Sequence, residues 1–70
     1  MKAIEILKQS FSTNMGLAES YNRKAKMHLS VDDFEYAESY KKEADDFIER
    51  AKKCQEAIEE LEGMLTLKTA

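Results

Sequence analysis

The sequence predicts an all-α protein: an antiparallel two-helix hairpin with an alanine-rich coiled-coil seam. Three observations lead to this prediction. The 70-residue chain contains no proline and only two glycines, so little in it interrupts long helices. Small or apolar residues recur at alternating steps of three and four in both halves of the chain. When the chain is folded back near residue 31, the two stripes face each other in register.

The second half of the chain carries the clearer helical pattern. Small or apolar residues occupy nine successive seam positions: Ala37, Tyr40, Ala44, Phe47, Ala51, Cys54, Ile58, Leu61 and Leu65. This spacing predicts one helix from about residue 31 to residue 62, roughly 48 Å long at 1.5 Å per residue. We expect Ser30 to cap its N-terminus, with Asp32 and Asp33 in the first turn, where the helix dipole favours acids. Gly63 is expected to end the helix.

The first half repeats the same spacing less regularly. Its stripe consists of Ile4, Leu7, Phe11, Ala18, Tyr21 and Ala25, with Asn14 and His28 at the two remaining positions. Poor helix formers between Ser10 and Gly16 leave two interpretations open: one continuous helix, or a break that gives three helices in all. The stripe stays in phase across this segment, whereas a loop would normally shift it. We therefore predict a single helix over about 2–29 and a turn at about 29–31.

The two stripes match in an antiparallel register in which the numbers of facing residues sum to 62. This layer pairs Ile4 with Ile58, Phe11 with Ala51, Ala18 with Ala44, and Ala25 with Ala37. The intervening layer, which sums to 61, pairs Leu7 with Cys54, Asn14 with Phe47, and Tyr21 with Tyr40. Because alanines face each other near the turn, we expect the helices to approach closely there.

Large apolar residues outside the seam suggest that the hairpin, 1–62, does not act alone. The candidate interface consists of Met15, Leu29, Phe34, Tyr36, Ile48, Met64, Leu65 and Leu67, the last three in a C-terminal tail, 63–70, with no partner in the first helix. Exposed apolar surface of this kind usually marks an interface. So short a chain also needs disulfides, a metal, regular packing or oligomerisation to be stable. We expect a homodimer in which two hairpins form a four-helix bundle.

Charge is divided unequally between the halves. Residues 1–30 carry five basic and two acidic residues, whereas residues 31–62 carry five basic and twelve acidic ones. The simplest interpretation is that the two helices attract each other across the hairpin. Two alternatives involve nucleic acid. The candidate basic patch Arg23, Lys24, Lys26 and His28 is suited to phosphates, or the acidic second helix imitates a nucleic-acid backbone and occupies a DNA-binding protein.

No residue pattern in the chain points to catalysis. His28 is the only histidine and lacks the Glu-x-x-His companions of a bundle metal site. Cys54 is the only cysteine; on the seam and far from His28 in the register, it resembles a small packed hydrophobe more than a nucleophile. We expect a protein that is not an enzyme and requires neither metal nor cofactor.

These patterns lead to a functional expectation without naming a partner. No apolar run exceeds two residues, so we expect no membrane span. The first residues also lack the apolar stretch of a secretory signal, and we expect a cytoplasmic protein. The expected function is a small protein–protein interaction module, an adaptor, assembly factor or inhibitor of a larger complex. Its partners would be a second copy of the chain and an unidentified protein.

Overall fold

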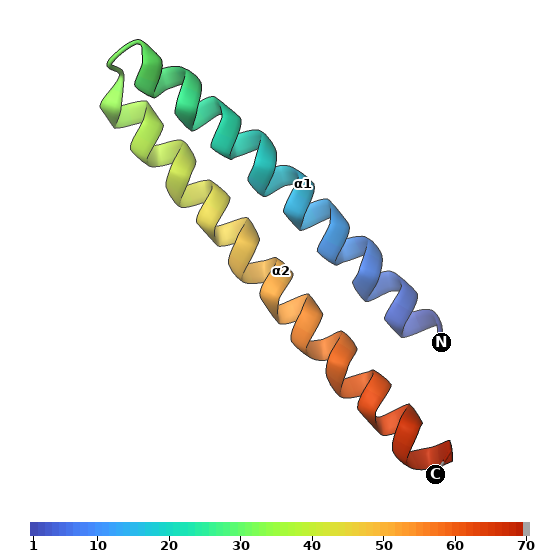
Figure 1. Ribbon diagram of the computed structural model, residues 1–70. Coiled ribbons are helices and arrows are strands. Elements are labelled where there is room, and N and C mark those ends of the chain that lie inside the picture. Colours follow the sequence, from blue (N-terminus) through green and yellow to red (C-terminus); the bar gives the residue numbers. More distant parts are fainter. Residues whose placement is uncertain (70) are drawn as a thin grey trace.

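Two helices make up the fold, and they lie side by side in opposite directions (Figure 1). The computed structural model describes residues 1–69, and the side chains of residues 1–67. Helix α1 spans Lys2–Ser30 and helix α2 spans Phe34–Thr69. Together they form a rod of 57 × 14 × 12 Å. The predicted all-α hairpin is confirmed, and the first helix runs without a break through the segment between Ser10 and Gly16.

A single seam of small side chains forms the core. The buried residues are Ile4, Ala18, Ala25, Ala37, Ala44, Ala51 and Ile58. All of them belong to the predicted layer whose numbers sum to 62, and Phe11, the eighth member, is half-buried. The second layer is half-buried, and its predicted pair Tyr21 and Tyr40 is stacked with ring centroids 6.0 Å apart. Burial therefore follows the predicted register along the hairpin.

The turn lies later in the chain than the predicted 29–31. Helix α1 is closed by two hydrogen bonds: the Asp33 N–H donates to the His28 carbonyl at 2.8 Å, and the Asp32 N–H donates to the Leu29 carbonyl at 3.1 Å. This pairing is the Schellman motif, which needs a left-handed residue just after the helix. Asp32 supplies it with φ of 59°. The carbonyls at the end of α1 are thus satisfied by residues 31–33 before a second helix begins.

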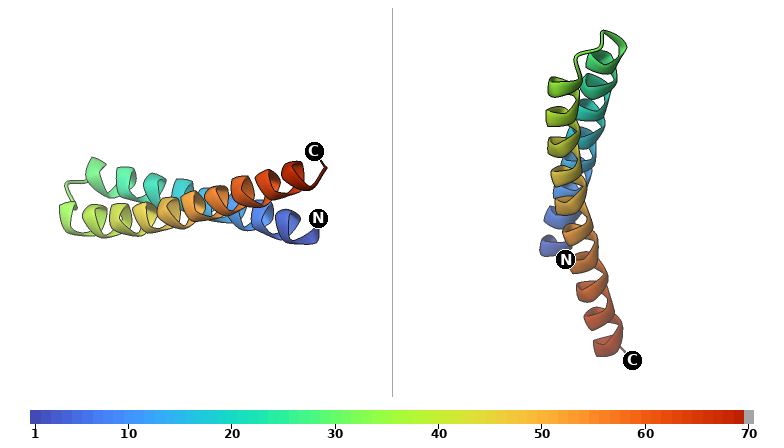
Figure 2. Two further views of the ribbon diagram at one scale, coloured as in Figure 1. Left: turned by 90° about the horizontal axis from the view of Figure 1, so that it is seen from below. Right: turned by 90° about the vertical axis from the view of Figure 1, so that its left-hand side faces the viewer.

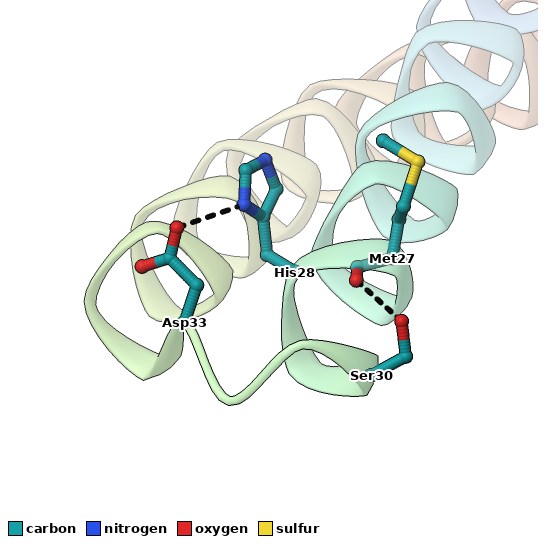
Figure 3. A network of polar contacts seen from close by, with 4 residues as sticks. All are labelled: Met27, His28, Ser30 and Asp33. Atoms are coloured by element: carbon teal, nitrogen blue, oxygen red, sulfur yellow. Dashed lines mark hydrogen bonds and ion pairs between the residues drawn. The ribbon is translucent and has the colours of Figure 1, made fainter.

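The prediction that Ser30 caps the second helix is wrong. Ser30 is the last residue of α1, and its hydroxyl donates to the Met27 carbonyl at 2.6 Å (Figure 3). Because the closing motif takes up residues 31–33, α2 begins at Phe34 instead of residue 31. Asp33 directly precedes it, and the Asp33 carbonyl accepts the N–H of Ala37 at 3.1 Å.

The expected stop at Gly63 is also wrong, because α2 continues to Thr69. Nothing lies within 4 Å of where a Cβ on Gly63 would stand, so no close contact or special backbone conformation requires glycine there. As a result, the predicted tail 63–70 is helical through Thr69, and its last residue lies outside the described part of the chain. Helix α2 runs past the N-terminus of α1, as the right-hand view of Figure 2 shows.

Candidate protein interface

The seam divides the surface of the hairpin into two sides. Met15 and Leu29 each follow a seam position of α1 by four residues, and Phe34 and Ile48 each precede a buried alanine of α2 by three. On paired helices these positions border the same edge of the seam. The structure agrees, because Met15 lines one hollow with Ile48, and Leu29 lines another with Phe34. We call this edge the apolar side.

The centre of the apolar side is a shallow hollow lined by Phe11, Met15 and Ile48. Phe11 reaches it from the seam, where it faces the small Ala51 and stays half-buried. Ile48 was expected to lie off the seam, and it is half-buried here. Met15 remains exposed. We refer to these three residues as the middle patch.

Two further apolar patches lie toward the ends of the rod. The turn patch consists of Leu29 and Phe34, both exposed, above the buried Ala25 and Ala37. The end patch consists of the residues that line a hollow at the open end of the hairpin: Met1, Leu61, Met64, Leu65 and Leu67. The register predicts that the segment after Gly63 extends past the first helix, and the structure places Met1 beside its apolar residues.

The opposite edge carries a ladder of aromatic rings that joins the two helices. From the turn inward, the rings alternate between α2 and α1 in the order Tyr36, His28, Tyr40, Tyr21 and Phe47. Successive centroids lie 5.6, 5.2, 6.0 and 5.5 Å apart, within the range of favourable ring contacts. We call this edge the aromatic side. Tyr36, though 60% exposed, therefore lies away from Phe34 and its patch.

Two cations cover the aromatic side. The Lys24 ammonium lies 5.1 Å from the ring centre of Tyr21 and 5.8 Å from that of Tyr40. The guanidinium of Arg50 lies 5.1 Å from the ring centre of Phe47. All three distances fall within the range of cation–π attraction. The rings of the aromatic side thus have cation partners within the hairpin.

The structure does not gather the candidate basic patch on one face. Lys24 and His28 belong to the aromatic side, where Lys24 covers rings and His28 is part of the ladder. Arg23 and Lys26 line the edge of the middle hollow instead. Arg23 also contacts Glu19 one turn earlier, at 3.0 Å. The four residues are thus divided between the two sides of the hairpin.

Direct ion pairs contribute little to joining α1 and α2. Among the side chains that the structure describes, the contacts within 4.0 Å are Arg23 with Glu19 inside α1, and His28 with Asp33 at the turn. The expected attraction between a basic and an acidic helix is not expressed as Lys or Arg pairs across the seam. Aromatic contacts and alanine packing join the helices there instead.

His28 and Cys54 occupy separate structural positions. His28 Nδ1 lies 3.1 Å from Asp33 Oδ2, so this side chain ties the end of α1 to the start of α2 (Figure 3). Its carboxylate neighbour is Asp33. Cys54 is half-buried on the seam. Within the described part of the chain, no three His, Cys, Asp or Glu side chains are arranged to hold a metal ion.

Asn14 shows how a polar residue fits on the seam. Its side-chain amide donates to the Ser10 carbonyl, one turn back in α1, at 2.9 Å. The ring of Phe47, which the register places opposite Asn14, stacks on Tyr21 one heptad along. The apolar residues of the interface were named from the sequence, but the ladder and its two cations were not.

Comparisons with protein-family models, with curated proteins and with solved structures found no match to this chain. Over residues 1–69, neither helix combines the length and the apolar character needed to cross a membrane.

Proposed function

We propose that this chain is a non-catalytic protein–protein interaction module that associates with itself through the apolar side. One observation carries the proposal: the chain exposes 5538 Å² of accessible surface. A compact monomer of 8.1 kDa exposes about 4,500 Å² by the usual scaling with mass. The excess, about 1,000 Å², is close to the roughly 800 Å² that each partner buries in a standard interface.

The composition of the core supports the same conclusion. Among the side chains of residues 1–67, five of the seven buried ones are alanines, and no large one is fully buried. Because hydrophobic stabilisation scales with apolar area removed from water, an alanine seam contributes less than a core of leucines. The large apolar side chains that would add to it, Met15, Leu29 and Phe34, lie exposed on the apolar side. A second copy of the chain would cover them.

In this proposal the protein acts by contact, as an adaptor, an assembly factor or an inhibitor of a larger complex. The assembled rods would present their aromatic sides, with Tyr36, Lys24 and Arg50, to a further protein. The proposed function involves no catalysis. A role as a nucleic-acid binder gains no support, since the basic residues of α1 are divided between the two sides.

Sedimentation equilibrium over a wide concentration range tests self-association. We expect a mass well above the 8.1 kDa of the single chain, and a melting temperature that rises with protein concentration, because only the folded state assembles. Met15→Lys should reduce the assembly to monomers. Leu17→Lys is the matched control: the two exposed residues, 41% and 38%, lie two positions apart on α1, on opposite sides of the seam. A monomer at every concentration, or equal effects of both variants, would refute the proposal.

A further inference from the structure

Apolar residues recur at equal steps along the apolar side. Met1, Met15 and Leu29 are separated by 14 residues each, and Phe34 and Ile48 are also 14 residues apart. Fourteen helical residues span about 21 Å at 1.5 Å per residue. Leu29 and Met1 therefore lie at equal distances on either side of Met15.

We propose that two copies pack apolar side against apolar side in antiparallel orientation, with the two-fold axis passing through the middle patches. This arrangement rests on the proposed self-association and specifies its geometry. The middle patch of each copy meets the same patch of the other. At both ends, Leu29 of one copy meets Met1 of the other, and the turn of one copy lies beside the overhang of the other, as a self-complementary interface requires.

The overhang of α2 fits this geometry. Phe34 and Glu62 lie equally far from Ile48, so Phe34 of one copy reaches the level of Glu62 in the other. There α2 has passed the end of α1, and Leu61 and Met64 line the end hollow with Met1, the residue before α1. The turn of the second copy would supply the cover that α1 no longer gives. In a parallel dimer the two overhangs would lie together with no turn to cover them.

Charges bordering the apolar side favour the same arrangement. The antiparallel dimer brings Lys26 to the level of Glu5 of the second copy, and Asp45 to the level of its Lys52. Each pair occupies equivalent heptad positions on neighbouring helices. Among these bordering positions, the antiparallel dimer brings one pair of like charges together, Glu38 and Glu59 of the second copy.

The parallel dimer has the less favourable set of charges. It brings Glu19 near Asp45 and Glu5 near Glu59, two like-charged approaches, against one opposite pair formed by Lys26 and Glu38. Such pairs contribute little to affinity, but they select orientation, because like charges in contact disfavour the wrong partner arrangement.

Distances between spin labels on the full chain distinguish these arrangements. Val31, exposed in the turn, is replaced by a labelled cysteine in a Cys54→Ala background. In the antiparallel dimer the two labels lie at opposite ends, about 50 Å apart, from 34 residues at 1.5 Å each. In a parallel dimer they lie together, about 25 Å apart or less, given helix diameters of about 10–12 Å.

A second label, in place of Glu49, serves as the control. It lies at the level of Ile48, beside the two-fold axis, and should give a distance well below 50 Å in either dimer. A long Val31 distance with a short Glu49 distance supports the antiparallel dimer. Two short distances in a protein of dimer mass overturn the antiparallel arrangement alone. A labelled protein that sediments as a monomer, with no distance between chains, overturns the proposed self-association as well.

Discussion

Asp32 is the one residue other than glycine with positive φ in the described chain, at 59°. It holds the left-handed position that lets the Schellman motif close α1. For an L-residue this conformation costs roughly 1 kcal/mol, somewhat less for aspartate and asparagine, because Cβ approaches a carbonyl oxygen. The side chain is exposed, so its own contacts do little to offset that cost.

Replacing Asp32 with glycine should therefore stabilise the protein, by about 0.5–1 kcal/mol. Replacing it with valine should have the opposite effect, since β-branched residues are poorly suited to positive φ. Urea denaturation at one fixed protein concentration measures both changes. A valine variant as stable as the glycine variant would show that the chain reverses by another route.

Ala44 tests packing at the most enclosed point of the seam, where its exposed fraction is 0%. The predicted register places it opposite Ala18, so extra volume there would force the helices apart. We expect Ala44→Leu to cost roughly 1–3 kcal/mol, as overpacked cores do. Ser39→Leu, at an exposed position of the same helix, should cost far less. Equal denaturation midpoints for the two variants would mean that the seam does not pass through Ala44.

At the scale of the helices, Gly63 tests whether α2 continues beyond the end of α1. Glycine inside a helix is less favourable than alanine by up to about 1 kcal/mol, because the unfolded chain gains freedom there. Since nothing would meet an added Cβ, Gly63→Ala should raise stability and helix content, measured by circular dichroism during denaturation. If α2 ended at Gly63 instead, the glycine would serve as a helix cap, and alanine would lower stability.

The sequence predicted the two helices and their seam because burial on paired helices leaves a heptad pattern. The positions of Ala18, Ala44 and Ile58 followed from that pattern alone. Helix ends were predicted less well. Glycine and serine are common at helix ends, which is why Gly63 and Ser30 were expected there. The actual ends depend on which carbonyls find a donor, as the His28 carbonyl finds the Asp33 N–H. Residue preference alone does not contain that information.

The candidate interface was predicted as a set of residues but not as a surface. Phe34 and Tyr36 were expected together, yet they border opposite edges of the seam, and Tyr36 stacks on His28. The heptad positions already distinguish these edges. The ring ladder is different, because the stacking of Tyr21 on Phe47 depends on side-chain rotamers that spacing does not specify.

On the scale of the whole molecule, the rod shape limits how much surface the two helices can bury against each other. At 57 Å long and 12–14 Å across, it has only one layer of contact between its helices. Lys24 and Arg50 cover rings on the aromatic side, whereas Met15, Leu29 and Phe34 on the apolar side are exposed. This asymmetry gives the two sides different proposed tasks: self-association on one, and presentation to a further protein on the other.

The final prediction tests whether the turn of one copy touches the overhang of the other. Phe34→Ala and a chain ending at Glu62 each remove one side of that contact, so each should weaken the dimer in sedimentation experiments. Because both changes remove the same contact, the double variant should be less impaired than the sum of the two. The expected coupling is about 0.5–3 kcal/mol in the free energy of dimer dissociation.

Tyr36→Ala is the matched control for this cycle. Tyr36 and Phe34 have nearly the same exposed fraction, 60% and 63%, but Tyr36 lies on the aromatic side. Its removal should lower the stability of the hairpin through the lost ring contact with His28, while its effect on dissociation should simply add to that of the shortened chain. Additive effects for Phe34→Ala as well would place the turn and the overhang in separate environments, and the antiparallel dimer would then be wrong.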